Sequence, residues 1–367
     1  MKQIIPAIFA ALMLTACGSS ELKVVVGTYT DTGSYGIYSL AFDTATGQYR
    51  MLDSCKTVNP SYLTPSRNGK YIYAVSELGS SNAAVYALRF DKRSGAFTPI
   101  NTVFAGGTDP CYIATNGKMV ATADYGGTLS VYPIASNGGL KPVKEVFEGS
   151  VGGPDSLRQE TPHIHCAAFS HDGKRLYASD FSADRLLCFD VVRRGRRLRP
   201  ANGNDGRQIV VGVAPDYGPR HLIFDRKGQH AYLIGELSGT ITVFGVADNM
   251  LTARQTIDAD PYDGRGSADI HISPDGRYLY ASNRLKGDGI AIFSVDPRSG
   301  ELTEAGYQFT GIHPRHFNIT PDGRYLLCAC RDDNSIEIYA RDKASGMLTP
   351  AGHTITLKKP VCIEFVQ

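Results

Sequence analysis

The chain has 367 residues, with 38 Lys and Arg against 36 Asp and Glu, for a formal net charge of +2. This near balance argues against nucleic acid as the main partner. The eight cysteines show no spacing typical of a metal site. The length exceeds that of an average domain, although a closed array of repeats can reach this size as one domain.

The first residues are expected to be an export signal. Lys2 supplies a positive charge, residues 4–12 are apolar, and Leu14-Thr15-Ala16-Cys17 follows. This last tetrapeptide resembles a bacterial lipobox, which implies a lipoprotein signal peptide over residues 1–16 and lipidation of Cys17. Residues 17–22 would then be a short tether, and the folded domain would occupy residues 23–367. The alternative is an ordinary signal peptide with an incidental cysteine.

The same phrase recurs six times after the signal. Each copy has an apolar stretch, a turn with glycine and a second, Tyr-rich apolar stretch. The turn glycines are Gly69, Gly117, Gly173, Gly228, Gly276 and Gly323. A period near 50 residues indicates a repeat architecture.

Each copy is expected to form four short strands. In the fifth copy these are residues 270–272, 278–281, 290–295 and a last strand after Leu302, separated by turn clusters such as Ser273-Pro274-Asp275-Gly276. No window outside the signal has a sustained helical period. Four-stranded antiparallel units of this length are propeller blades.

The chain ends supply the remaining blade. Residues 359–366 match only a first strand, whereas residues 23–27, 36–42 and 48–53 match the second, third and fourth strands. Joined, they form one blade from both termini, which closes the ring and removes exposed sheet edges. The fold class is therefore all-β, a seven-bladed propeller.

Aligning the copies on their turn glycines points to a functional site. Positions eight residues before or after the glycine lie at the end of each hairpin opposite its turn, so they should meet at one mouth of the propeller. These positions diverge in residue type, although the blades pack alike. The first set is Ser61, Asp109, His165, Arg220, Ala268, Arg315 and Val361, and the second is Glu77, Tyr125, Phe181, Glu236, Arg284, Arg331 and Tyr29.

The candidate site residues concentrate in neighbouring copies. His165, Arg220, Glu236 and Arg284 are the expected catalytic residues, with His165 or Glu236 as the base. Several cations in one funnel would bind an anionic small molecule. The expected substrate-binding residues are Arg315, Asp269, His271, Arg265 and His163.

Other interpretations of these residues remain open. Glu236 and Arg220 could be only a structural pair on adjacent strands, and His271 could be a core histidine. His221 and His316 follow Pro-Arg pairs and are expected to point to the opposite face, in packing or hydrogen-bonding roles. No hydrolase elbow, zinc motif, calcium loop or phosphate-binding loop occurs, so neither a metal nor another cofactor is expected.

These phrases together resemble the seven-bladed propeller lactonases, the family of 6-phosphogluconolactonases and carboxymuconate cycloisomerase-2-like enzymes. The resemblance rests on Gly218-Pro219-Arg220-His221, Glu236-Leu237, residues 268–272, Asn283-Arg284 and Pro314-Arg315, and it covers residues 23–367. It implies lactone chemistry, and the site proposed for the cycloisomerase branch carries over onto His165, Arg220, Glu236 and Arg284.

The resulting hypothesis is metal-independent hydrolysis of a sugar-acid lactone such as 6-phosphogluconolactone. The base would activate water while the two arginines bind the anionic group and the developing oxyanion. Two alternatives remain: a lactone-forming isomerase of the carboxymuconate type, and a propeller that binds an anion without turnover.

The lipid signal implies the cell envelope of a Gram-negative bacterium, facing the periplasm or the surface, with membrane contact through the lipid only. No obligate protein partner is expected.

Overall fold

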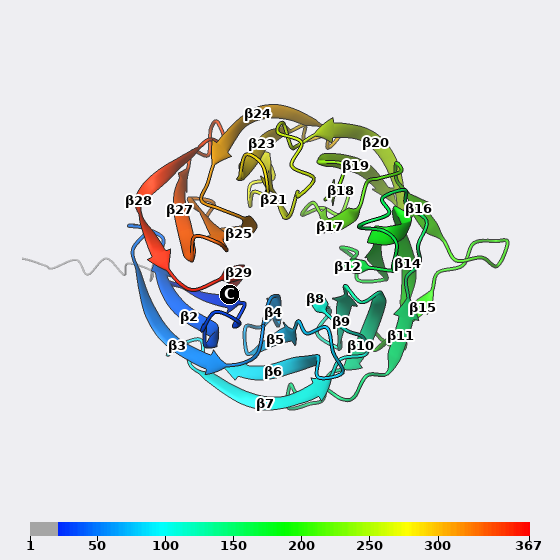
Figure 1. The fold of residues 1–367 in the computed structure, drawn as a ribbon, viewed down its shortest axis with the longest axis horizontal. Coiled ribbons are helices and arrows are strands. Elements are labelled where there is room, and N and C mark those ends of the chain that lie inside the picture. The colour runs from blue at the N-terminus through cyan, green and yellow to red at the C-terminus, as the bar shows by residue number, and fades with distance from the viewer. Residues whose placement is uncertain (1–20) are drawn as a thin grey trace, which may run out of the picture.

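The computed structural model describes residues 21–367, which form a ring of seven antiparallel sheets around a central axis (Figure 1). The predicted signal peptide and Cys17 lie outside the described residues. Within residues 21–367, no helix is long and apolar enough to cross a membrane. The predicted seven-bladed propeller is confirmed.

Each sheet is one blade, and the blades are numbered in chain order. Within each blade the strands are given from the axis outward. The closing blade contains β29 (Pro360–Val366), β1 (Glu21–Thr28), β2 (Gly36–Asp43) and β3 (Tyr49–Lys56). Blades 1 and 2 contain β4 (Leu63–Pro65), β5 (Tyr71–Ser76), β6 (Ala84–Phe90) and β7 (Phe97–Phe104), then β8 (Pro110–Thr115), β9 (Met119–Asp124), β10 (Thr128–Pro133) and β11 (Glu145–Glu148). Blade 3 contains β12 (Ile164–Phe169), β13 (Arg175–Asp180), the 3-10 helix η1 (Phe181–Ala183), β14 (Arg185–Val192), β15 (Arg197–Pro200) and β16 (Val210–Gly212).

The other three blades have four strands each. Blade 4 contains β17 (Pro219–Phe224), β18 (His230–Gly235), β19 (Thr240–Ala247) and β20 (Met250–Asp258). Blade 5 contains β21 (Ile270–Ile272), β22 (Tyr278–Asn283), β23 (Gly289–Val295) and β24 (Leu302–Phe309). Blade 6 contains β25 (Pro314–Ile319), β26 (Tyr325–Cys330), β27 (Ser335–Arg341) and β28 (Leu348–Thr356).

Blade 3 departs from the expected four strands. β15 pairs only with Phe189–Val192, the second half of β14. The first half of β14 would therefore leave an open edge, and β16 pairs with residues 185–187 to cover it. An inserted loop thus completes this blade.

The closing blade joins the two ends of the chain. β29 pairs with β1 from Lys23↔Val366 to Thr28↔Pro360, which confirms the predicted shared blade. The paired strands are fully buried at their centres: Val24, Val25, Val26 and Ile363 are 0% exposed. β1 begins at Glu21, two residues before the predicted start of the domain.

A contact that recurs in four blades holds neighbouring blades together and accounts for a tyrosine in the second stretch of those four copies. A tyrosine on the second strand of a blade donates its hydroxyl hydrogen bond to a loop carbonyl in the next blade. The pairs are Tyr73 to Gly138 at 3.0 Å, Tyr177 to Asn249 at 2.5 Å, Tyr232 to Gly300 at 3.0 Å and Tyr280 to Gly346 at 2.7 Å. Gly300 and Gly346 have φ of +74° and +78°, a conformation that glycine adopts without strain.

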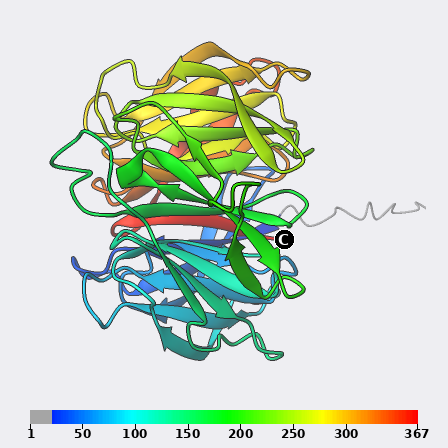
Figure 2. The same ribbon diagram turned by 90° about the vertical axis from the view of Figure 1, so that its right-hand side faces the viewer.

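The two ends of the ring differ. The first strand of each blade runs from one end of the axis to a tight hairpin turn at the other. We call the end with these turns the turn face and the opposite end the funnel face. The C-terminus lies at the turn face, at the right of Figure 2, because the backbone of Gln367 lies against Gly69 in the β4–β5 turn.

The seven cysteines within residues 21–367 are buried and free. Cys328 and Cys330 lie on one face of β26 with their sulfur atoms 3.9 Å apart and no disulfide between them. Residues 193–196, three of them arginines, form the turn between β14 and β15.

Deletion of residues 360–367 tests the ring closure. The deletion removes Val361, Cys362 and Ile363, each at most 1% exposed. Because each such side chain contributes about 1.5–3 kcal/mol, their loss is a large fraction of a typical stability of about 5–15 kcal/mol. We expect aggregation or loss of cooperative unfolding, measured by circular dichroism and gel filtration. Deletion of Gln367 alone is the control. A monomeric 360–367 deletion with an unchanged melting temperature would contradict the closure.

Candidate functional site

A short backbone irregularity at the start of the first strands positions the site. In blades 2, 3, 4 and 6 the pairing register shifts just after the first residue of the first strand. Such a bulge lets two consecutive side chains face the same side. The outer members of these pairs are Cys111, His165, Arg220 and Arg315, and the inner members are Tyr112, Cys166, His221 and His316.

Glu236 is the centre of the site. It follows β18 directly and is 6% exposed. Its carboxylate accepts hydrogen bonds from Arg220 Nε at 2.9 Å and from Arg158 at 2.7 Å, and Arg284 lies 3.4 Å away. Burial alone would raise the pKa of Glu236, but Arg284, Arg220, His165 and Arg158 lower it well below its ordinary value. Glu236 is therefore a carboxylate at neutral pH and a weak proton acceptor.

His165 lies beside this carboxylate and is the other candidate for the base. Its Nε2 lies 3.9 Å from Glu236 Oε2, and its side chain is 5% exposed. Burial, and then the charge of Arg220, hold its pKa well below 6.5. The imidazole is therefore neutral at pH 7 and can accept a proton.

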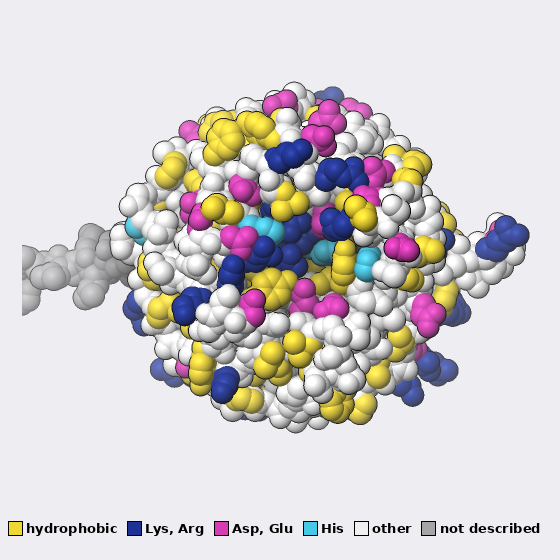
Figure 3. All heavy atoms as spheres, viewed as in Figure 1, with side chains coloured by type: hydrophobic (Ala, Val, Ile, Leu, Met, Phe, Trp, Pro, Cys, Tyr) yellow, Lys and Arg dark blue, Asp and Glu magenta, His cyan; other side chains and the backbone are white. Residues whose placement is uncertain are grey.

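Arg284 and Arg315 extend the positive charge around the axis. Arg284 donates from Nε to the Gly266 carbonyl at 2.7 Å, and its guanidinium lies 3.2 Å from His313 Nε2. Arg315 lies over the ring of Tyr29 and 3.9 Å from Glu77. Figure 3 shows Lys and Arg side chains gathered with histidines at the centre of the funnel face. The structure thus brings together all four residues expected to be catalytic.

A second layer closes the axis beneath this cluster. It contains Tyr62, Tyr112, Cys166, His221, Asp269, His316 and Cys362. Tyr62 from blade 1 packs against the rings of both His221 and His316. Its ring centroid lies 5.8 Å from that of His221 and 5.4 Å from that of His316, so these histidines meet at the axis. The prediction that His221 and His316 point to the opposite face is wrong, because the bulge turns them inward. Their predicted hydrogen-bonding role is confirmed.

The hydrogen bonds of this layer lead to Arg220. Burial lowers the pKa of His221 to about 3, so its ring is neutral. Arg220 donates to His221 Nε2 at 3.2 Å, and His221 Nδ1 donates to Asp269 Oδ1 at 2.8 Å. Asp269 therefore contacts Arg220 only through His221.

Two overlapping groups of this region have the types and spacing of metal ligands. Asp269, His271 and His316 form one group and His316, Cys362 and Glu364 the other, with the ligand atoms of each group within 4.8 Å of one another. However, His316 Nδ1 accepts a hydrogen bond from the Ile363 amide at 3.2 Å, which places the proton of the neutral ring on Nε2. This Nε2 lies 3.5 Å from Asp269 Oδ2 but forms no hydrogen bond with it. Asp269 also accepts bonds from His271 and from the Phe317 amide, at 3.0 and 3.2 Å. These protons favour a hydrogen-bonded cluster over a metal centre.

The remaining predicted binding residues lie at different levels. His163 stacks on Tyr125 at the rim, with ring centroids 3.9 Å apart. Arg265 forms ion pairs with Asp155 at 2.7 Å and Asp216 at 2.8 Å, and so ties three loops together. His271 lies in β21, two residues after Asp269 and nearer the turn face. Its side chain is 23% exposed.

Sequence reasoning missed Arg158, His313 and Cys111. Arg158 lies in the long loop between β11 and β12, outside the repeated phrase. The unusual length of this loop was the sequence signal that could have indicated a functional residue there. His313 precedes Pro314 with φ of +62°, at a ring position that the alignment did not use. In blade 2 the alignment selected Asp109. The β8–β9 turn is two residues shorter than the corresponding turns of the other blades, so the residue of blade 2 equivalent to His165 of blade 3 is Cys111.

Replacing Glu236 with Gln should destabilise the protein in a pH-dependent manner. The lowered pKa of Glu236 means that its ionised form stabilises the fold above the unfolded pKa, and that this contribution is lost as the pH falls below about 5. Leaving three guanidinium groups without their carboxylate should cost about 3–5 kcal/mol at pH 7. Urea unfolding at pH 7 and pH 4 measures both effects. A difference between wild type and E236Q that does not shrink on acidification would contradict this electrostatic role.

Comparisons with known proteins agree with this geometry. Two curated relatives are the 6-phosphogluconolactonases of Formosa agariphila, 34% identical over 88% of this chain and 93% of the relative, and of Bacillus subtilis, 32% identical over 93% and 97%. The periplasmic gluconolactonase of Pseudomonas aeruginosa has a similar structure, with a TM-score of 0.88 and 32% identity over 95% of this chain and 99% of that one. A crystal structure from Bacteroides uniformis has a TM-score of 0.92 and 51% identity over 95% and 100%. The sequence model described as "Lactonase, 7-bladed beta-propeller" matches residues 23–365, so the chain belongs to this lactonase family.

Proposed function

We propose that the protein hydrolyses a sugar-acid lactone, with 6-phosphoglucono-1,5-lactone as the reference substrate. The observation that carries the proposal is a neutral, buried imidazole 3.9 Å from a carboxylate that is bound by arginines. Relatives named 6-phosphogluconolactonase and gluconolactonase support the same substrate class.

His165 is the general base in this proposal. It removes a proton from water as the oxygen attacks the lactone carbonyl carbon. The tetrahedral intermediate then expels the ring oxygen, which takes the proton back from the imidazolium. Glu236, 3.9 Å from the ring, stabilises the imidazolium between these two steps.

Glu236 also positions the arginines. It binds Arg220 and Arg158 and lies 3.4 Å from Arg284, which fixes these guanidinium groups around one point. Arg220 and Arg284 stabilise the oxyanion that forms on the carbonyl oxygen. Asp269 holds Arg220 through His221, so we assign it a positioning role, and His271 supports Asp269.

The anionic group of the substrate binds at the rim in this proposal. Arg158 is 35% exposed and reaches Glu236 with one guanidinium nitrogen, and Arg315 lies across the axis. Arg265 keeps the Arg158 loop in place through Asp155, and His163 forms the adjacent wall. A surplus of guanidinium groups over carboxylates favours a phosphorylated or carboxylated lactone.

We further propose that the protein acts in the cell envelope, anchored through lipid on Cys17. The Leu14-Thr15-Ala16-Cys17 sequence supports the anchor. The similarity to a periplasmic gluconolactonase is consistent with this location. An envelope location makes a non-phosphorylated sugar lactone a second candidate substrate.

Replacing His165 with Asn should lower kcat for lactone opening by about 10²–10⁴-fold, with KM changed little, because a general base contributes this much. The lowered pKa of His165 predicts a kcat/KM that is flat from pH 6 to pH 8 and falls only at lower pH. Stopped-flow measurement of acid release, corrected for spontaneous hydrolysis, gives kcat of the variant and the pH profile of kcat/KM. His171→Asn, an exposed histidine of the same blade, is the control. Unchanged kcat in H165N would rule out this role.

Replacing Arg158 with Gln should raise KM for the phosphorylated lactone by roughly 10-fold, since a charge-assisted contact contributes about 1.5–3 kcal/mol. KM for gluconolactone, which lacks the phosphate, should change by less than about threefold. Steady-state kinetics with both lactones measure the contrast, and Arg93→Gln on the turn face is the control. An equal rise for both substrates would show that Arg158 does not bind the phosphate.

A further inference from the structure

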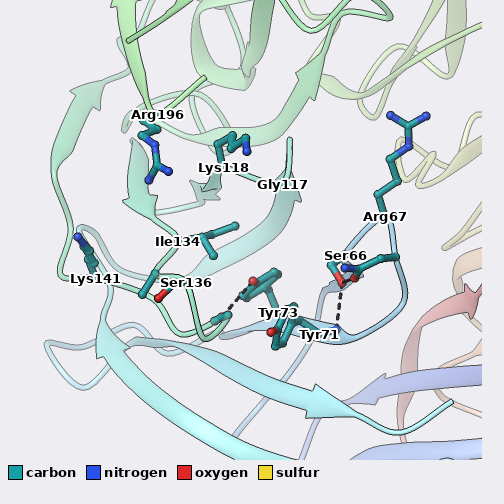
Figure 4. A pocket seen from close by; sticks show the side chains of 13 residues that line it. Ser66, Arg67, Tyr71, Tyr73, Gly117, Lys118, Ile134, Ser136, Lys141 and Arg196 are labelled. Carbon is teal, nitrogen blue, oxygen red and sulfur yellow. Dashed lines mark hydrogen bonds between the residues drawn. The ribbon is translucent and has the colours of Figure 1, made fainter. Parts of the chain in front are cut away.

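A second charged feature lies at the opposite end of the molecule from the Glu236 cluster. A groove of about 720 Å³ opens on the turn face between blades 1 and 2. Four cations line it: Arg67, Lys118, Lys141 and Arg196. Figure 4 shows Lys118, Lys141 and Arg196 on one side of the groove and Arg67 on the other.

No carboxylate lines this groove. All four cations are exposed, and within residues 21–367 none of their side chains has an ion-pair or hydrogen-bond partner. Ser136 adds a hydroxyl group, whereas the hydroxyl of Ser66 is already donated to Asn68 Oδ1 at 2.8 Å. The groove therefore presents positive charge and hydrogen-bond donors, a combination suited to phosphate groups.

The repeat shows that this charge is a local departure from the pattern of the ring. The residue before the turn glycine is Asp172, Asp275 and Asp322 in blades 3, 5 and 6, and its carboxylate caps the turn. In blades 1 and 2 the same cap is made by Asn68 and Asn116, which accept hydrogen bonds from Lys70 N at 3.1 Å and Lys118 N at 2.9 Å. Asparagine preserves the turn but removes its negative charge at the edges of the groove.

A groove between blades 4 and 5 provides the comparison. It has a volume of about 490 Å³ and is lined by Arg226 and Lys227. It also contains Asp225, Asp275 and Asp296, which offset these cations. The unbalanced charge thus distinguishes the groove between blades 1 and 2 from a related groove in the same ring.

The start of the described chain lies at the same face. β1 runs from Glu21 to Thr28, and Lys23 pairs with Val366 beside the C-terminus at the turn face. Cys17 is only four residues before Glu21, a distance of at most about 14 Å in an extended chain. A lipid on Cys17 would therefore hold the turn face near the bilayer, with the funnel face directed away from it.

We propose that the groove between blades 1 and 2 is a docking surface for phosphate-bearing headgroups of an anionic membrane. Lipid on Cys17 supplies the anchor, and the four cations orient the ring on the surface so that the funnel remains open to solvent. Surface attraction of this kind acts within about 8 Å at physiological salt, which is compatible with the short tether. The proposal rests on the proposed lipid anchor at Cys17 but is independent of lactone hydrolysis.

The experiment uses residues 18–367, which include all described strands but lack the lipidated cysteine. Sedimentation with vesicles of phosphatidylcholine, alone or with one-third phosphatidylglycerol, gives the partition coefficient at 50 and 300 mM salt. Binding should require phosphatidylglycerol and weaken with salt. Replacing Arg67, Lys118, Lys141 and Arg196 with Gln should reduce it by at least about 30-fold, given the contribution of each cation near an anionic surface.

A charge-matched variant distinguishes the groove from net charge. Lys56, Arg254, Lys286 and Lys358 lie outside the groove, and replacing them with Gln should change partition by less than about threefold. Equal losses in both variants, or no binding to anionic vesicles, would overturn the proposal. Calorimetric titration with inorganic phosphate provides the last arm: saturable phosphate binding without vesicle binding would make the groove a site for a soluble anion and would also overturn it.

Discussion

The pairing of β1 with β29 is the constraint on which the rest of the structure depends. It turns an array of repeats into a closed ring, in which each tyrosine lock holds one blade against the next. Closure brings the first strands of seven blades to one axis. Residues separated by more than 100 positions, such as Arg158 and Arg284, can then bind one carboxylate.

Burial and charge oppose each other at Glu236, and their balance supports the roles proposed for the site. Desolvation would favour the protonated acid, but the surrounding guanidinium groups keep it ionised. Burial and the charge of Arg220 keep His165 neutral. A carboxylate bound by arginines beside a neutral imidazole is the arrangement from which we propose His165 as the base and Glu236 as its electrostatic partner.

Much of this was predictable from sequence because the repeat provides its own internal comparison. The phrase alignment predicts seven blades, the shared closing blade and the proximity of His165, Arg220, Glu236 and Arg284. It fails where the local backbone leaves the repeat. Because the β8–β9 turn is shorter, Cys111 and not Asp109 occupies the aligned position in blade 2. The bulge in blade 4 turns His221 toward the axis. Arg158 lies in an insertion to which no repeat position corresponds.

The two ends of the propeller have different chemistry for a common geometric reason. Strand ends at the funnel face converge on the axis, where the bulges add a second inward side chain in blades 2, 3, 4 and 6. Hairpin turns at the turn face are held by Asp or Asn caps, so their charge can vary without loss of the turn. Function can therefore diverge at both ends while the blades remain alike.

The central claim is that the funnel catalyses hydrolysis of a lactone and does not merely bind an anion. The most direct measurement is a proton NMR time course of 6-phosphogluconolactone and gluconolactone with the purified protein and EDTA, in water enriched in ¹⁸O, followed by mass spectrometry of the product. The account predicts ring opening well above the spontaneous rate, with one ¹⁸O in the carboxylate of the product. Ligand binding without acceleration of either lactone, or an isomerised product without ¹⁸O, would contradict it.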